Sequence, residues 1–498
     1  MPMRSPLTCE QRTAATAVAA RVYIEAGPGS GKTTVAAERF GVLRYGTSAD
    51  LRRILALSFT RSACSELEVR IRRRWGSSAL SWPHQALTLD ALHCEILGFL
   101  LRRGTISWMG RHTELTVLDT WRGQTGARWM SSGTNYKRVA TLYGTVVRSD
   151  GKKVTSPGYY ISQKGPFETH LAAGRCTHAE VRQVIRAALR SPELRVGITK
   201  YLTDTVKGVI IDEVFDADLL DLEVIHLIAS AGISTTIIGD PWQALYDFRG
   251  ARPELVSELV KLDSFDCFSV ESSFRFKTQE MIRIAAEARS GKPIFLNEAA
   301  DAAECNIVLA HQWDTLWAGP DCVLPFSFGR LDNQTDAAVT LLLDRLIQSR
   351  FGQPAINATE AAVLLGLDQD RLRNDAALID LVLMAVRQGT VEAATAAIDA
   401  LRNILRALGS PARLPRLKQE SEKLLHNRLL NLARRMQQSH VVAGISVHQA
   451  KGREWPTVGI RLTDPERARL AAGLQYDRPD DRLLYVALTR AAQTVVCC

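Results

Sequence analysis

A glycine-rich segment near the N-terminus has the residue types and spacing of a phosphate-binding loop. Residues 26–33 read AGPGSGKT, and they follow an apolar run and precede a helical stretch. In this context glycines let backbone N–H groups converge on phosphate oxygens, and the positive end of the helix attracts the anion. Lys32 would reach the β- and γ-phosphate oxygens, and the Thr33 hydroxyl would ligate Mg²⁺. The alternative is a turn that binds nothing. The candidate nucleotide-binding residues of this loop are Gly27, Gly29, Ser30, Gly31, Lys32, Thr33 and Thr34.

A pair of carboxylates could complete a hydrolytic site. Asp212 and Glu213 follow the apolar run at residues 209–211. Asp212 would hold Mg²⁺, and Glu213 would polarise the water that attacks the γ-phosphorus. The alternative is an acidic helix N-cap, which is a common role for such a pair. With the loop upstream, these residues favour hydrolysis of a nucleoside triphosphate bound with Mg²⁺.

The elements that must position these residues alternate between strands and helices. Short apolar runs that end in polar turns are typical of buried parallel strands, and they occupy residues 22–25, 54–59, 209–211, 235–238, 458–462 and 494–498. Helical stretches follow most of them, for example residues 33–45 and 62–75. The alternation predicts an α/β fold with parallel sheets.

Two segments interrupt the alternation. The first, residues 98–200, begins with a helical stretch and is rich in Gly and Ser after Gly104. The second, residues 350–440, has apolar positions at helical spacing over residues 375–387, 391–408 and 419–436. We therefore predict an inserted accessory domain, mainly helical, in each of two cores.

The positive charge of the chain is concentrated in the first of these segments. The whole chain has a formal net charge of +9, and residues 98–165 contain 11 Lys or Arg but only three acids. Trp and Tyr residues lie among these cations, a mixture that suits phosphate contact and base stacking. The equal alternative is a solvated basic face over an aromatic core.

Composition excludes several other classes of protein. No run approaches the length of about 20 apolar residues that a membrane-spanning helix needs. The first residues contain no apolar region of a signal peptide, so we expect a cytoplasmic protein with no membrane partner. The nine cysteines have no Cys-x-x-Cys spacing, which argues against a disulfide framework and against zinc or iron–sulfur sites.

Together these segments resemble the motifs of the UvrD/Rep-type superfamily 1 DNA helicases. The motifs occur in the family's order along nearly the whole chain. Residues 7–11 (LTCEQ) are similar to the family's adenine-reading segment, which implies that Gln11 pairs with adenine. Residues 58–63 (SFTRSA) and 88–93 (TLDALH) are similar to two segments that line the single-strand groove. The resemblance implies DNA contacts by Phe59, the stacking candidate, and by His93. A buried Phe at the end of a strand is the alternative for Phe59.

The most diagnostic stretch is residues 237–251 (IIGDPWQALYDFRGA), which closely resembles the family's third motif. The resemblance implies that Gln243 senses the γ-phosphate and that Tyr246, Phe248 and Arg249 form the DNA contacts of the same loop. Residues 270–275 (VESSFR) resemble the fourth motif, with Phe274 stacked on adenine and Arg275 as a charge-neutralising finger.

Two later segments resemble the fifth and sixth motifs. Residues 446–455 (SVHQAKGREW) imply a DNA contact by His448 and a ribose contact by Glu454. Residues 482–491 (RLLYVALTRA) imply a second finger, Arg490. The implied catalytic set is Lys32, Asp212, Glu213, Gln243, Arg275 and Arg490, with Mg²⁺ held by Thr33 and Asp212. Arginine fingers accelerate hydrolysis because they neutralise transition-state charge.

The sequence also departs from the family's pattern. Phe215 stands where the family usually has a Gln that relays between nucleotide and motifs, and Ser273-Phe274 replaces Asn-Tyr. The second insertion, about 90 residues by these boundaries, is shorter than in the large members. We therefore expect the coupling between ATP hydrolysis and DNA binding to be altered.

We therefore expect two RecA-like parallel-sheet cores of the P-loop NTPase type. The first comprises residues 1–97 and 200–263, with a basic insertion at 98–199, and the second comprises 264–349 and 441–498, with a helical insertion at 350–440. The resemblance implies an ATP-dependent 3′–5′ DNA translocase or helicase that acts on single-stranded DNA and on junctions of single and double strands. The alternative is a DNA-stimulated ATPase subunit that unwinds little and serves a protein partner such as a nuclease or defence complex.

Overall fold

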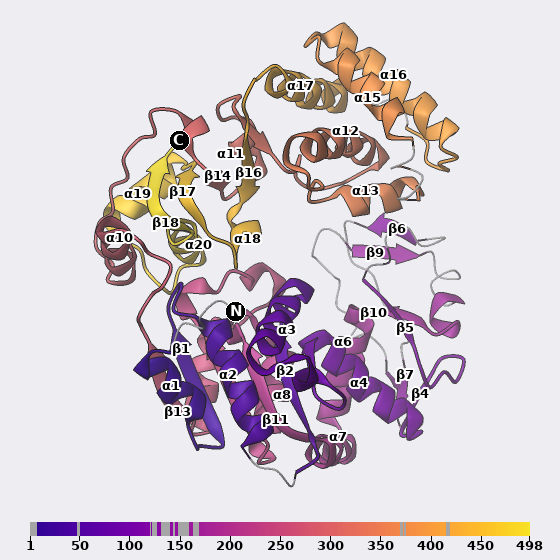
Figure 1. Cartoon of the computed structure of the whole chain (residues 1–498). Helices are drawn as coiled ribbons and strands as arrows, with labels where there is room; N and C mark the ends of the chain where they lie inside the picture. The colour runs from indigo at the N-terminus through magenta and orange to yellow at the C-terminus, as the bar shows by residue number, and fades with distance from the viewer. Residues whose placement is uncertain are drawn as a thin grey trace. The chain divides into compact units, whose positions relative to one another are not determined.

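The computed structural model describes most of the chain: residues 7–46, 50–119, 121, 127–130, 140–142, 145–147, 159–162, 169–368, 372, 375–414 and 419–498. The chain divides into two compact units, Met1–Arg275 and Phe276–Cys498 (Figure 1). Among the described residues, no helix is both long enough and apolar enough to cross a bilayer.

The first unit contains a six-stranded sheet in the order β13-β1-β12-β11-β2-β3, in which every neighbouring pair is parallel. Its strands are β1 (Arg21–Ala26), β2 (Arg53–Ser58), β3 (Gln85–Thr88), β11 (Val206–Asp212), β12 (Ser234–Gly239) and β13 (Asp266–Val270). Four of them confirm the strands expected at residues 22–25, 54–59, 209–211 and 235–238. β3 and β13 were not expected, and both lie at edges of the sheet.

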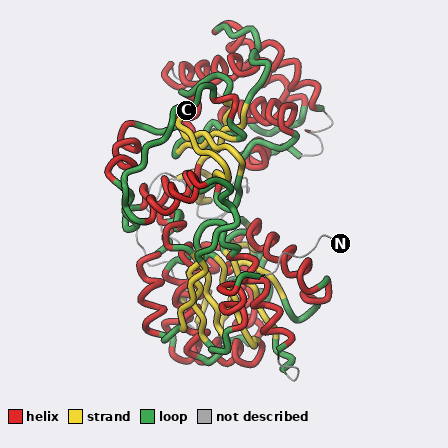
Figure 2. Tube along the Cα trace, turned by 60° about the vertical axis from the view of Figure 1, so that its left-hand side comes forward, coloured by secondary structure: helices red, strands yellow, loops and turns green. Residues whose placement is uncertain are grey.

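Helices cover both faces of this sheet (Figure 2). Side chains of adjacent residues point to opposite faces. Leu55 and Ile211 belong to one buried apolar cluster, while Ile54 and Ile210 belong to the other. The continuous apolar runs of these strands are therefore explained by burial on both sides. The core helices are α1 (Cys9–Thr16), α2 (Lys32–Tyr45), α3 (Arg61–Trp75), α4 (Leu89–Arg102), α8 (Leu219–Ser230) and α9 (Pro253–Leu262). Short 3₁₀ helices are η1 (Ser77–Leu80), η2 (Val214–Asp216), η3 (Pro241–Gln243) and η4 (Asp247–Arg249).

The first insertion leaves the core after α4 and returns to β11. Its described part contains short strands as well as helices, which adds small sheets to the helical domain that the sequence predicts. The strands are β4 (Ile106–Trp108), β5 (Thr116–Leu118), β6 (Ala127–Met130), β7 (Ala140–Leu142), β8 (Thr145–Val147), β9 (Tyr159–Ser162) and β10 (Arg175–Thr177). The helices α6 (His178–Arg190) and α7 (Pro192–Thr205) contribute to the same buried cluster as α4 and α8.

The second unit contains a five-stranded parallel sheet in the order β15-β16-β14-β17-β18. The strands are β14 (Ile307–Ala310), β15 (Val323–Pro325), β16 (Val442–Ser446), β17 (Trp455–Ile460) and β18 (Ala491–Cys497), and the last two confirm the expected strands. Its helices are α10 (Gln279–Arg289), α11 (Trp313–Trp317), α12 (Gln334–Phe351), α18 (Val447–Ala450), α19 (Asp464–Ala472) and α20 (Pro479–Leu488), with η5 (Ala302–Glu304).

The second insertion is helical in its described part, as the apolar spacing predicts. Its helices are α13 (Ala358–Leu365), α15 (Ala376–Val386), α16 (Val391–Ala407) and α17 (Gln419–Met436). The boundary between the two units differs from the expected one. Strand β13 pairs with β1, so the first unit continues to Arg275 and does not end at residue 263.

Candidate nucleotide and nucleic-acid site

The glycine-rich loop joins β1 to α2 and is packed against the segment that follows β13. Gly29 and Gly31 have φ angles of +71° and +83°, a left-handed conformation that favours glycine. A Cβ atom on Gly29 would overlap the Cβ of Arg275 and lie 2.7 Å from the Ser273 Oγ. The backbone N–H of Phe274 donates to the Gly29 carbonyl at 2.9 Å, and the Ser273 hydroxyl donates to the Pro28 carbonyl at 2.8 Å. Close packing therefore fixes the loop and residues 273–275 together.

Lys32, the first residue of α2, is buried and directed at polar side chains that follow the neighbouring strands β11 and β12. Its ammonium donates to the Gln243 Oε1 at 3.1 Å and lies 3.9 Å from the Glu213 Oε1. The Gln243 amide is oriented in turn by Asp240, which accepts from the Gln243 Nε2 at 2.9 Å. Asp240 lies within the third motif, but its role could not be assigned from the sequence.

Asp212 is the last residue of β11, and Glu213 follows it directly at the C-terminal end of the strand. Asp212 is buried and hydrogen-bonded to the Thr33 side chain. Burial raises the pKa of Asp212, the neighbouring Glu213 raises it further, and Lys32 and Thr33 oppose the shift. Glu213 has a φ of +62°, which is rare for a residue other than glycine and marks a strained position.

The oxygen ligands of Thr33 and Asp212 suit a hard divalent cation such as Mg²⁺, which uses few protein ligands when phosphates supply others. A bound cation would also favour the ionised form of the buried Asp212 carboxylate, in the same sense as Lys32 does. The donor set therefore fits Mg²⁺ bound together with a nucleotide.

Gln11 lies under the same loop. Its Nε2 donates to the Ser30 carbonyl at 2.8 Å, and its Oε1 accepts from the Thr8 N–H at 3.1 Å, which completes the N-terminal cap of α1. The amide expected to read adenine is thus buried and hydrogen-bonded to the loop. Thr34 points elsewhere, since its hydroxyl accepts from Arg70 on α3 at 3.1 Å.

Arg275 lies in the same unit as the glycine-rich loop, beside Gly29, whereas the sequence predicts it in the second core. Its neighbour Phe274 is 50% exposed, so part of its side chain is accessible. The reason for the difference is β13, which adds residues 266–270 to the first sheet and carries residues 271–275 to the loop.

The third motif leads from the nucleotide side to a cluster of two aromatic rings and a cation: Tyr246 is partly buried, and Phe248 and Arg249 are exposed. Phe248 is 68% exposed, and its ring centroid lies 6.0 Å from that of Tyr246. The Arg249 guanidinium lies over both rings, at 4.9 Å from the Tyr246 centroid and 5.5 Å from the Phe248 centroid. An exposed ring beside a cation is an arrangement that can bind a stacked base and its backbone.

Two other predicted DNA contacts are less accessible. Phe59 follows β2 and is partly buried against the apolar core, close to the alternative given for it. His93 is fully buried on α4, 3.6 Å from an oxygen of Asp221 and 3.4 Å from the Arg182 Nη1. The structure therefore places His93 in the interior and not on a surface. Spacing along the sequence could not reveal this burial, because its partners lie far along the chain.

Only part of the basic segment lies among the described residues. Arg102, Arg103 and Arg111 are exposed, but Trp108 and Trp121 are buried core residues. Their indole N–H groups donate to the Leu171 carbonyl at 2.8 Å and to the Glu180 Oε1 at 3.2 Å. The side chains of the other counted cations, Arg122, Arg128, Lys137, Arg138, Arg148, Lys152, Lys153 and Lys164, lie outside the described residues.

The second unit carries the remaining candidates. Arg490 is 1% exposed, and its guanidinium donates to the carbonyls of Val486 at 3.1 Å and Arg453 at 3.3 Å. Glu454 is exposed beside Arg453, and His448 is partly exposed at the start of α18. The His448 ring lies 6.2 Å from that of His311, which follows β14.

Comparison with known proteins identifies the family. The model of the UvrD/REP helicase N-terminal domain matches residues 7–122 and 171–262, which lie in the first unit and include both ends of the first insertion. The chain belongs to the UvrD/Rep-type superfamily 1 helicases. Its two parallel sheets are the RecA-like cores of that family.

Individual relatives of this UvrD/Rep-type chain are distant. An ATP-dependent DNA helicase, UvrD2 of Mycobacterium tuberculosis, is 25% identical over 547 aligned residues, covering 98% of this chain and 78% of the relative. A probable DNA helicase of Mycoplasma pneumoniae is 25% identical over 52% of this chain and 50% of its own length. The ATP-dependent DNA helicase Rep of Escherichia coli is 21% identical over 49% of this chain and 37% of its own length.

Proposed function

We propose that this chain is an ATP-dependent DNA translocase or helicase that moves 3′–5′ on single-stranded DNA. One observation carries the proposal: the Lys32 ammonium is hydrogen-bonded to Gln243, five residues before the exposed Phe248. The loop that would sense the γ-phosphate is therefore continuous with the loop that would hold bases. ATP hydrolysis and DNA binding would then depend on one continuous segment of the chain.

The residues of the first unit divide the chemistry among them. Lys32 neutralises the β- and γ-phosphate oxygens, and Thr33 and Asp212 would hold Mg²⁺, which supplies further charge neutralisation when bound. Glu213 orients the attacking water and accepts its proton, and its left-handed backbone directs the carboxylate toward Lys32. Arg275 stabilises the charge of the departing phosphoryl group, and Phe274 and Gln11 support the adenine end of the site.

The second unit would add Glu454 at the ribose, His448 at DNA and Arg490 as a second finger. These roles, and the 3′–5′ direction, come from the family resemblance and stand as parts of the proposal. Junctions between single- and double-stranded DNA are the substrates that a helicase of this type would unwind.

ATP hydrolysis and strand separation test the proposal separately. Purified protein should hydrolyse ATP faster with single-stranded DNA than without it, and Lys32→Ala should abolish both rates. Displacement of a labelled strand from duplexes with either a 3′ or a 5′ tail tests unwinding and direction. Intact turnover in Lys32→Ala, or ATP hydrolysis that ignores DNA, would contradict the proposal.

A second candidate function is a DNA-stimulated ATPase subunit that unwinds little and regulates a partner nuclease or defence complex. Phe215 favours it: the ring is buried against Gly239 and meets the Tyr23 ring edge-on with centroids 6.5 Å apart. An apolar ring there cannot relay hydrogen bonds as an amide would. DNA-stimulated hydrolysis without strand displacement would support this candidate, and displacement by the chain alone would refute it.

A further inference from the structure

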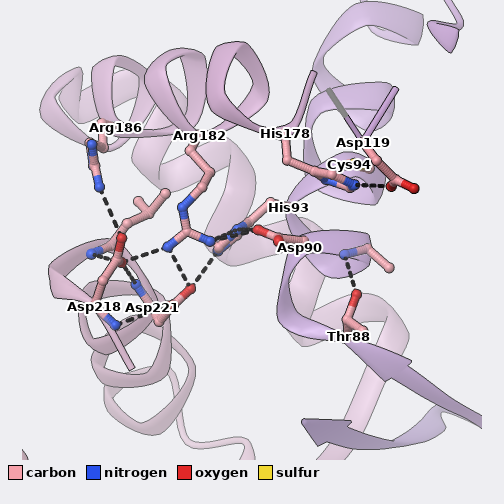
Figure 3. Close-up of polar contacts among 12 residues, drawn as sticks. Thr88, Asp90, His93, Cys94, Asp119, His178, Arg182, Arg186, Asp218 and Asp221 are labelled. Atoms are coloured by element: carbon pink, nitrogen blue, oxygen red, sulfur yellow. Dashed lines mark hydrogen bonds and ion pairs between the residues drawn. The ribbon is translucent and has the colours of Figure 1, made fainter. Parts of the chain in front are cut away.

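A largely buried guanidinium from the first insertion joins two core helices (Figure 3). Arg182 lies on α6 and is 19% exposed. Its Nη1 is 2.6 Å from Asp90 on α4, and its Nη2 is 2.6 Å from Asp218 and 3.0 Å from Asp221, both at the start of α8. One planar fork therefore holds both helices, a geometry that a single ammonium cannot reproduce.

The electrostatics of the cluster favour the charged forms of Asp90 and Asp218 in spite of burial, whereas burial raises the pKa of Asp221. Burial opposes ionisation of Asp218, but Arg182 outweighs this effect and lowers the pKa of that carboxyl. Burial likewise opposes ionisation of Asp90, whose pKa is nevertheless lowered by His93 and Arg182. A buried charge cluster has a specific geometry because each member loses its partners when it moves.

The α4 end of this link belongs to residues 88–93, called the groove segment because they resemble a motif that lines the single-strand groove. Helix α4 begins at Leu89, where the Thr88 hydroxyl accepts from the Ala91 N–H at 3.1 Å. Asp90 occupies the first turn of the helix. A shift of the groove segment therefore acts directly on the carboxylate that Arg182 holds.

The α8 end of this link is connected to the carboxylate pair, Asp212 and Glu213. It is also connected to the loop at residues 246–251, called the aromatic loop because it contains Tyr246 and Phe248. Asp218 lies five residues after Glu213 and caps α8, since its Oδ1 accepts from the Leu220 N–H at 2.8 Å. The backbone of Asp218 forms an antiparallel bridge with Ala251, and the Arg252 N–H donates to the Ala217 carbonyl at 2.8 Å. The loop that contains the exposed Phe248 is thus fastened at the residue that Arg182 binds.

We propose that Arg182 is a positioning residue that links the groove segment at α4 to the aromatic loop and to the carboxylate pair, so that stimulation of ATP hydrolysis by DNA depends on it. The inference rests on the proposed function and adds to it the route by which strand binding reaches the hydrolytic residues. In this proposal Arg182 acts through Asp90 and Asp218.

The test compares ATP turnover with and without single-stranded oligodeoxythymidylate. In Arg182→Lys the charge remains but the fork is lost, and we expect the ratio of stimulated to basal turnover to fall about 5-fold, within the range of about 2- to 30-fold typical of such coupling residues. Basal turnover and the KM for ATP should be unchanged. Asp218→Asn should give a similar fall, because Asn still caps α8 but binds a guanidinium more weakly. The double variant should fall no further than either single one.

Arg186→Ala is the matched control. Arg186 lies one turn from Arg182 on α6, is 45% exposed, and binds the other oxygen of Asp218 at 3.1 Å. Its contact is with α8 and does not join that helix to α4, so its loss should leave the stimulation ratio unchanged. Circular dichroism checks that each variant is folded, and Asp218→Asn carries the test if Arg182→Lys does not fold.

The outcomes separate this inference from the proposed function. A wild-type protein that DNA does not stimulate would refute the proposed function and the inference with it. Wild-type stimulation retained in both folded variants would refute the inference alone. An equal fall in Arg186→Ala would also overturn it, because general weakening of α6 would then explain the effect.

Discussion

Replacing Gly29 with alanine tests whether the phosphate loop and residues 273–275 form one packed unit. The backbone at residue 29 is left-handed, with φ +71°, which costs an alanine about 1–2 kcal/mol. The new Cβ would lie 2.7 Å from the Ser273 Oγ, where an ordinary contact begins at 3.4 Å. The segment that carries Arg275 must therefore move by at least about 0.7 Å at Ser273, and by more at the Arg275 Cβ, which the new atom would overlap. A displacement of about 1 Å at a catalytic group can reduce turnover by about 10²-fold, so we expect Gly29→Ala to lose DNA-stimulated ATP hydrolysis on that scale.

Gly232→Ala is the control for backbone strain. Gly232 has a similar φ of +77° in the turn before β12, but a Cβ atom placed there would have no neighbouring heavy atom within 4 Å among the described residues. Backbone strain should cost each variant about 1–2 kcal/mol of unfolding free energy in urea denaturation. Gly29→Ala should lose more because of the overlap, and only Gly29→Ala should lose ATP turnover. Equal turnover in the two variants would refute the argument that residues 273–275 are held against the loop.

Three further predictions concern other parts of the chain. Phe248→Ala should weaken binding of single-stranded DNA by about 1–3 kcal/mol in fluorescence anisotropy, whereas Leu262→Ala, at a residue 71% exposed in the same unit, should not; equal effects would argue against stacking. Phe215→Gln should lower the free energy of unfolding by about 3 kcal/mol, because it buries an amide in an apolar site, and a loss below about 1 kcal/mol would show that the amide finds partners there. Glu466 raises the pKa of His311 above its ordinary value near 6.5; the pair therefore stabilises the folded state below that pH and loses its effect as pH rises through the higher folded value. His311→Gln should remove this pH dependence, which urea denaturation between about pH 6 and 8 would detect, and an unaltered profile would count against it.

The central strands and the phosphate loop could be predicted because local sequence determines them. Strands buried on both faces must be apolar throughout, as the alternate assignment of Ile54 and Leu55 to the two clusters shows. β13 could not be predicted in this way, because Asp266 and Cys267 are exposed at the edge of the sheet. The glycine spacing of the loop directly reflects the left-handed backbone at Gly29 and Gly31.

The burial of several candidate residues depends on contacts with segments that are distant in the sequence. His93 lies in a segment that resembles a DNA-groove motif, yet its burial depends on Asp221 and Arg182, which come from helices far along the chain. The same holds for Arg182, which no local spacing marks as special. Trp108 and Trp121 were candidates for a stacking surface, but helix α6 and its neighbours cover them.

The boundary after Arg275 has a consequence for the order of events at the nucleotide. Because residues 271–275 belong to the first unit, Arg275 is held beside Gly29 of the phosphate loop by contacts within that unit. Arg490, in contrast, is carried by the other unit. If the proposed function holds, ATP binding would depend on groups of the first unit, and the chain could hold ATP without hydrolysing it.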